Sequence, residues 1–125
     1  MGITNAGYNF HAAIMIGESP TPYNNANAYI GVGNGTTAFS ADQTDLQGVS
    51  KLRKAMDAGY PTRATNTLTF KATFGTADAN WAWNEWGIFN AATGGTMHNR
   101  EVESLGSKTS SVTWVFQVNI SLVSA

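Results

Sequence analysis

The sequence contains no cysteine, which excludes disulfide bonds, thiolate metal sites and cysteine nucleophiles. Charge is also scarce: only 12% of the 125 residues are charged, and the formal net charge is -1. Such a chain does not capture nucleic acid or an anionic membrane by general electrostatic attraction. The longest apolar run, residues 12–16, is too short to span a membrane. The N-terminus has neither the basic nor the long apolar region of a secretory signal, so we do not expect one.

Small polar residues take the place of charges, with 15 Thr, 12 Asn and 13 Gly. Because 42% of the residues are hydrophobic and the net charge is close to zero, the chain should fold rather than stay disordered. Its length predicts a single domain over residues 1–125. Within it, residues 1–24 are an N-terminal arm or contain a short helix, with Thr4 or Asn5 as the cap and Gly17 at its end. A strand over about 4–16 is a further alternative.

Apolar and polar residues alternate over 26–32, 68–74 and 112–122, the period of a half-buried strand. The last of these is the longest match and predicts a strand of about 12 residues. Residues 81–90 and 96–103 predict two further strands joined by a turn at 91–95. Together these segments predict a mainly β fold, an antiparallel, Greek-key-like β-sandwich.

One longer helix is predicted over residues 45–58. Thr44 and Gln47 have the spacing of a capping box, while Gly59 and Pro61 supply the stop signal. The apolar residues near helical spacing are Leu46, Val49, Leu52 and Met56. The glycines of the preceding segment, Gly31-Val-Gly33-Asn-Gly35, favour an Asn-Gly hairpin turn over a phosphate-binding loop, because the Gly-Lys-Ser/Thr ending is missing.

Candidates for catalysis are few. Glu85 lies in an aromatic strand, and Glu101 and Glu103 share one face of the next strand, so a glycosidase-like carboxylate pair is one hypothesis. We favour the other, an ion pair between Glu85 and Arg100 across the hairpin, because opposite charges on paired strands are common. We therefore expect no enzymatic activity and no catalytic residue.

The two histidines, His11 and His98, are 87 positions apart and form no metal-binding motif, so we expect packing or surface roles for them. No cofactor or metal is predicted. Lys51, Arg53 and Lys54 form a small basic group that favours a solvent-exposed face over a phosphate site.

Tryptophan and phenylalanine are concentrated in residues 81–90. Strict alternation would place Trp81, Trp83 and Phe89 on one face of that strand and Trp86 and Ile88 on the other. A strand that is apolar on both faces is either central or covered by a second chain. We favour core or interface packing over stacking on sugar rings in a carbohydrate-binding site. The residues predicted to form an interface or support it are Trp81, Trp83, Trp86, Phe89, Trp114, Glu85 and Arg100.

Several segments resemble small virion structural proteins of tailed bacteriophages, in particular tail-fibre-like and decoration-like proteins. The similarity lies in residues 25–39 (NANAYIGVGNGTTAF), 43–48 (QTDLQG), 51–57 (KLRKAMD) and 68–75 (LTFKATFG). It is most characteristic at 83–90 (WNEWGIFN), followed by 94–97 (GGTM) and Asn99-Arg100.

The resemblance implies a non-enzymatic virion protein built in many copies and assembled in the cytoplasm of a bacterial host. Its partners would be itself, as a homotrimer, and other virion proteins. A tail or fibre location is the first hypothesis, and capsid decoration of the head is the second. A carbohydrate-binding module for host attachment, with a host-surface glycan as ligand, is a further alternative.

Overall fold

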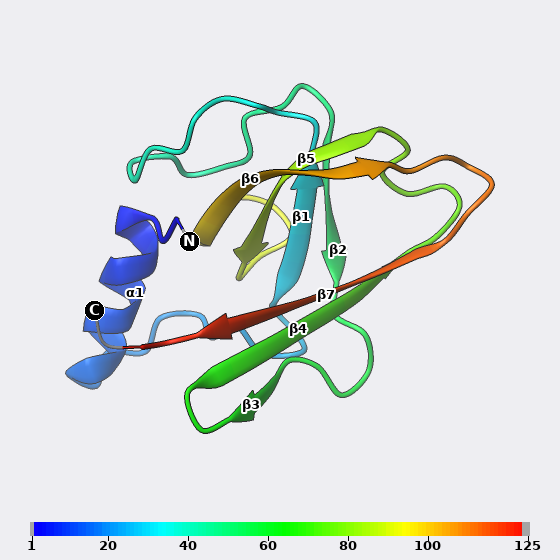
Figure 1. Ribbon diagram of the computed structural model, residues 1–125. Coiled ribbons are helices and arrows are strands. Elements are labelled where there is room, and N and C mark those ends of the chain that lie inside the picture. Colours follow the sequence, from blue (N-terminus) through cyan, green and yellow to red (C-terminus); the bar gives the residue numbers. More distant parts are fainter. Residues whose placement is uncertain (1, 124–125) are drawn as a thin grey trace.

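Alternating apolar side chains build two antiparallel sheets that face each other, as seen in the computed structural model, which describes residues 2–123 (Figure 1). The first sheet has the strand order β2-β1-β5-β6 and the second the order β3-β4-β7. The strands are β1 (Tyr29–Gly33), β2 (Lys51–Ala55), β3 (Thr62–Ala64), β4 (Thr67–Phe74), β5 (Ala82–Phe89), β6 (Met97–Ser107) and β7 (Trp114–Ser121). The prediction of a mainly β, antiparallel sandwich is confirmed.

The core lies between the sheets and takes one side of β1, β4, β5 and β7, with partly buried Leu52 of β2 and Leu105 of β6 packed against it. Strand β4 shows the expected alternation, with Phe70, Ala72 and Phe74 buried and the residues between them partly exposed. The other buried members are Ala28, Ile30, Val32, Met56, Ala79, Trp83, Trp86, Ile88, Val118 and Ile120. Removing these side chains from water is the main stabilising contribution to the fold.

A helix forms at the N-terminus, α1 (Asn5–Met15), so the helical alternative for residues 1–24 is confirmed. Thr4 is its N-cap, and the Thr4 hydroxyl accepts a hydrogen bond from the Gly7 backbone N–H at 2.9 Å. The same hydroxyl donates to the Met97 carbonyl, which ties the start of α1 to the start of β6. The helix stands at one end of the sandwich (Figure 1).

The helix predicted over residues 45–58 is wrong. Residues 34–50 form a loop, and residues 51–55 form β2, an edge strand paired with β1. Leu46 is buried, but as a residue of this loop that packs against Phe89 and Met97, and not on a helix face. Local capping and spacing signals are weak next to tertiary contacts, and here the strand pairing with β1 prevails. The last predicted strand is also shorter than expected, since β7 covers 114–121.

The aromatic strand does not keep strict alternation, so the predicted faces of β5 need correction. The pairing of β5 with β6 shifts register between Trp83 and Glu85. Trp83 therefore packs into the same core as Trp86 and Ile88, while Phe89 lies on the opposite face of the sheet. An irregularity of this kind re-aims side chains, and it cannot be read from a two-residue period.

A second, smaller apolar cluster covers the outer face of the β2-β1-β5-β6 sheet. Phe89, Met97 and Leu46 are buried there beneath the 34–50 loop. Gly31 has no room for a side chain, since a Cβ at this position would lie 2.6 Å from the Phe89 ring. The cluster brings the 34–50 loop down onto the sheet, where the polar network described next fixes it.

Candidate functional site

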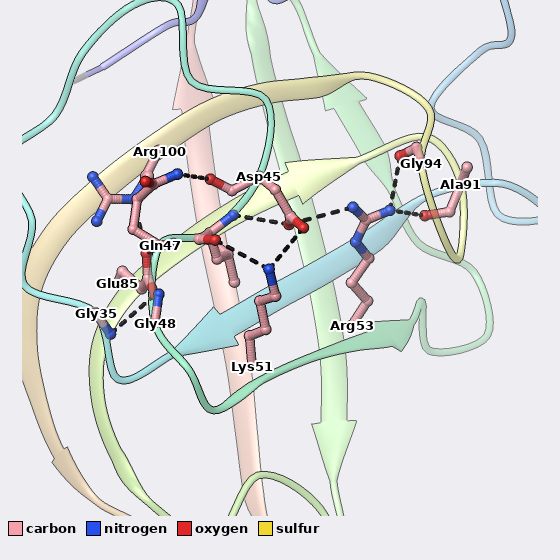
Figure 2. A network of polar contacts seen from close by, with 11 residues as sticks. Gly35, Asp45, Gln47, Gly48, Lys51, Arg53, Glu85, Ala91, Gly94 and Arg100 are labelled. Atoms are coloured by element: carbon pink, nitrogen blue, oxygen red, sulfur yellow. Dashed lines mark hydrogen bonds and ion pairs between the residues drawn. The ribbon is translucent and has the colours of Figure 1, made fainter.

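Glu85 is the centre of a buried polar network beneath the 34–50 loop (Figure 2). Its side chain is fully buried, and four N–H groups donate to its two oxygens. The Gln47 N–H and the Arg100 Nε–H reach Oε1, each at 2.8 Å. The Gly48 and Gly35 N–H groups reach Oε2 at 2.7 and 3.0 Å. The predicted pairing of Glu85 with Arg100 is confirmed.

The network keeps Glu85 ionised. Burial by itself would raise the pKa of the Glu85 carboxyl, but the backbone N–H donors and the Arg100 guanidinium outweigh it and hold the pKa below its ordinary value. A general acid needs the opposite, a pKa raised toward neutrality. Glu85 is therefore equipped to hold the loop through a fixed negative charge.

The glycines around Glu85 are there for close approach. A Cβ added at Gly35 or Gly48 would lie 2.5 or 2.8 Å from Oε2, and a Cβ at Gly33 would lie 2.4 Å from it. None of the three has the positive φ of a hairpin turn, and β1 runs on into the long loop. The Asn-Gly hairpin turn predicted at residues 33–35 is thus wrong. The backbone N–H groups bind an anion, but it is the chain's own carboxylate.

Arg100 also extends the network to the middle of the loop. The side chain is fully buried, and its Nη1–H donates to Gln43 Oε1 at 3.1 Å. Glu85 and Arg100 are not directly opposite, since Arg100 pairs with Gly87 and Glu85 with Val102. The ion pair therefore runs diagonally across β5 and β6 and holds three parts of the 34–50 loop at once.

A second ion-pair group borders the first (Figure 2). The Asp45 carboxylate accepts from Lys51 Nζ at 3.0 Å and from Arg53 Nη2 at 3.4 Å. Arg53 also donates to the Ala91 and Gly94 carbonyls and stacks over the Phe89 ring, 3.6 Å from its centroid. Burial opposes ionisation of Asp45, but Lys51 and the Leu46 N–H prevail and lower its pKa. Lys54 pairs with Asp78 at 2.8 Å, so all three members of the basic group have specific partners.

The carboxylate pair considered for glycoside hydrolysis is not assembled around Glu85. Glu103 accepts a hydrogen bond from Trp86 Nε1 at 3.0 Å, and Trp86 points to the face of the sheet opposite Glu85. Glu101 accepts from the Gly2 N–H at 2.5 Å. The neighbours of Glu85 are donors, which suits a structural anion.

The predicted interface aromatics divide into two groups. Trp83, Trp86 and Phe89 are buried within the chain, so they have almost no surface left for a partner. Trp83 makes edge-to-face contacts with Phe74 and Trp114, with ring centroids 4.8 and 4.9 Å apart. Trp83 and Trp86 pack in the core between the sheets and Phe89 in the smaller cluster under the 34–50 loop, which is the core-packing alternative of the prediction.

Trp81 and Trp114 are only half-buried and keep exposed surface. The Trp81 indole N–H has no hydrogen-bond partner among the described residues. Trp114 lines a groove of about 290 Å³ between β6 and β7, together with Leu105 and Phe116. Of the predicted aromatics, only these two remain available to a partner.

The two histidines, far apart in sequence, meet where α1 packs on β6. Their Nε2 atoms are 2.9 Å apart, and His98 Nδ1 lies 3.2 Å from the Asn99 amide oxygen. Burial lowers the pKa of His98; the hydrogen bond to Asn99 works against this and the neighbouring His11 adds to it. Among residues 2–123, no group of three or more ligating side chains is placed to hold a metal ion. The alternation of apolar and polar residues in the sequence gives no indication of the contact between His11 and His98.

Beside the histidines, a mostly apolar pocket of about 370 Å³ opens under α1. Phe10 and Ile14 of the helix line one side, and Leu68, Phe70 and Ile120 of the second sheet line the other. The Tyr23 hydroxyl donates to the Thr96 carbonyl, and burial raises the pKa of this phenol. His11 and His98 also line the pocket and are its titratable imidazoles.

Large apolar side chains are exposed on and beside α1. We call this set the α1 apolar surface; its members are Tyr8, Ile14, Met15, Ile16, Leu122 and Val123. Met15 is 88% and Ile16 76% exposed, values unusual for such side chains in a protein with no partner. The surface continues into a groove of about 370 Å³ between α1 and the end of β7, lined by Ile3, Tyr8 and Leu122 among others.

No protein-family model and no curated protein sequence matches the chain. Among residues 2–123, no helix has both the length and the apolar character needed to cross a membrane.

Proposed function

We propose that the protein is a non-enzymatic structural component of a tailed-phage virion, present in many copies and located at the tail or its fibres. The observation that carries the proposal is the α1 apolar surface, exposed at one end of a rigid, sparsely charged sandwich. Exposed apolar side chains gathered in one region mark an interaction site. The sequence resemblance supplies the phage context.

The buried network supports the same role. The charges of Glu85 and Arg100 fix the 34–50 loop. Both Glu85 oxygens and the Nε and Nη1 groups of Arg100 are bound, and Arg100 Nη2 is buried with no partner among the described residues. A module whose ionic groups rigidify loops is suited to repeated contacts with identical neighbours. Location on the head as a decoration protein is the alternative within this class.

A carbohydrate-binding role has weaker support. Stacking on a sugar ring requires an exposed indole face, and Trp83 and Trp86 are buried. Trp81 and Trp114 are the tryptophans that retain exposed surface.

Quantitative mass spectrometry of purified phage particles tests the proposal. We expect the chain to copurify with particles in a small multiple of three or six copies for a tail location, and in hundreds of copies for the head. Accumulation of the chain in infected cells without incorporation into particles would contradict it. A glycan array serves as the second arm: a specific hit that Trp81→Ala or Trp114→Ala abolishes would instead support carbohydrate binding.

A further inference from the structure

The two sheets have four edge strands, β2 and β6 in one and β3 and β7 in the other. Proteins normally protect such edges against pairing with other chains, using charges, proline, short strands, irregular register or a covering segment. Strand β2 carries Lys51, Arg53 and Lys54 within five residues. Strand β3 is only three residues long, contains Arg63 and follows Pro61. Both edges are protected.

Strand β6 is protected in two ways. Residues 2–4 cover its first half: Ile3 bridges Asn99, and the Thr4 and Arg100 N–H groups make backbone hydrogen bonds across the pair. Its second half carries Glu101 and Glu103 and a shift in register.

Strand β7 has none of these devices. It is eight residues long and pairs with β4 on one side only. From residue 109 to residue 125, the sequence has no charged residue, no proline and no glycine. A long, uncharged, regular edge is a template for adding a strand.

The hydrogen-bonding groups of this edge can be assigned. The Leu122 N–H donates to the Asn66 carbonyl at 2.9 Å, next to the paired residues Ser121 and Thr67. Because hydrogen-bonded and non-hydrogen-bonded pairs alternate in an antiparallel ladder, the even-numbered residues of β7 direct their amides to β4. The N–H and C=O groups of the odd-numbered residues therefore point to the free edge: Val115, Gln117, Asn119 and Ser121.

We propose that β7 of a second copy of this chain pairs antiparallel with this edge, about a two-fold axis. With Val118 on the axis, Gln117 lies opposite Asn119 of the second copy, and Val115 lies opposite Ser121. All four outward-facing residues of each copy are then hydrogen-bonded. As an account of how copies assemble, the pairing rests on the proposed function.

The side chains favour a second copy as the occupant, because in this register β7 complements itself. On the outer face, the Gln117 and Asn119 amides meet across the axis. On the core face, Val118 meets Val118 of the second copy, and Phe116 meets its Ile120. At these central positions polar residues face polar ones and apolar residues face apolar ones, the cross-strand matching that stabilises sheets. Farther from the axis, Val115 lies opposite Ser121.

Grooves at the two ends of β7 fit the same arrangement. One is lined by Leu105, Trp114 and Phe116, and the other by Tyr8, Leu122 and Val123. Two-fold pairing places the Trp114 end of each copy beside the Leu122 end of the other. Each apolar groove therefore receives apolar side chains, and the second sheet becomes six-stranded, β3-β4-β7 continued by β7-β4-β3.

Light scattering after size-exclusion chromatography tests the pairing. We expect twice the 13.3 kDa mass of one chain for the unmodified protein, and one chain for the variant Gln117→Lys/Asn119→Lys, which brings four ammonium groups together at the axis. The matched control, Thr62→Lys/Ala64→Lys, adds the same charge to exposed positions on the opposite edge of the same sheet and should remain dimeric.

A cross-link tests the register and does not depend on the lysine variants folding. The chain has no native cysteine, so Val118→Cys introduces one thiol per copy. In the proposed register the two residues at position 118 form a non-hydrogen-bonded pair on the axis, and their Cα atoms lie about 4.5 Å apart. Mild oxidation should join two copies. With Ser121→Cys the thiols lie roughly 20 Å apart, and no cross-link should form.

Monomeric unmodified protein, a mass that Gln117→Lys/Asn119→Lys leaves unchanged, or equal cross-linking at positions 118 and 121 would each overturn the pairing. A trimer insensitive to the lysines, found in particles, would reject the pairing and leave the proposed function standing. A dimer that the lysine substitutions disrupt, in a protein that is missing from particles, would support the pairing and reject the proposed function.

Discussion

At position 85 the chain buries a full negative charge beneath a loop and surrounds it with four N–H donors. Removing one partner from a buried ion pair is costly because it leaves the other charge uncompensated. In this protein the loss would also leave the Gly35, Gln47 and Gly48 N–H groups without their acceptor. The stability of the 34–50 loop thus depends on a single side chain.

Replacing Glu85 with Gln should lower the free energy of unfolding at pH 7 by about 3–5 kcal/mol. The folded-state pKa of Glu85 is below its ordinary value of 4.5, so its contribution is complete above pH 4.5 and disappears as the pH falls through the folded value. Urea denaturation at pH 7 and below pH 4.5 measures both effects, and the variant should lose part of the acid dependence. The exposed Glu18→Gln is the control and should match the unmodified protein; equal loss in both variants would contradict the role of Glu85.

The contacts that attach helix α1 to β6 lie at its start and near its middle. Thr4 joins its start to the Met97 carbonyl, and His11 contacts His98 near its middle. The imidazole pair holds only while at most one ring is charged, because two imidazolium groups have no acceptor to share and repel each other. The attachment of the helix therefore responds to pH.

Acidification from pH 7.5 to 5.5 should loosen α1. The pKa of His98 is below its ordinary 6.5 in the fold, so the unfolded state binds its proton first and stability falls as the pH drops through 6.5. Hydrogen exchange, corrected for intrinsic rates, should show faster exchange in α1 relative to β4 at the lower pH. His98→Gln should remove most of this difference; an unchanged difference would reject the histidine contact as its cause.

Two sheets pack as one molecule because large aromatic side chains bridge them. Trp83 of β5 contacts Phe74 of β4 as well as Trp114 and Phe116 of β7, and its indole N–H donates to the Ala79 carbonyl at 2.9 Å. A truncation here removes contacts with both strands at once and leaves a cavity.

Trp83→Ala should destabilise the fold by about 3–5 kcal/mol, measured by chemical denaturation monitored by circular dichroism. Trp81→Ala is the matched control, because Trp81 is half-buried and its N–H has no partner among the described residues. We expect a clearly smaller loss for the control. Similar losses for both variants would show that Trp83 does not join the sheets as described.

Local patterns in the sequence are enough to predict the β-sandwich, the strands around 68–74, 81–90 and 96–103, and the contact between Glu85 and Arg100. Each of these follows from side-chain alternation or from opposite charges on strands joined by a short turn, and both are local signals. The sequence leaves the N-terminal helix open against an arm or a strand, and the structure shows the helix with Thr4 as its N-cap.

The remaining features depend on contacts between residues that are distant in the sequence. The apolar residues of 45–58 have helical spacing, but the segment forms no helix. Glu85, 37 or more positions away in the sequence, binds the Gln47 and Gly48 N–H groups, and residues 51–55 pair with β1 as a strand. The register shift after Trp83 and the meeting of His11 with His98 depend equally on distant partners. Periodicity reports which face of a segment is apolar; which other segment covers that face is set by packing of the whole chain.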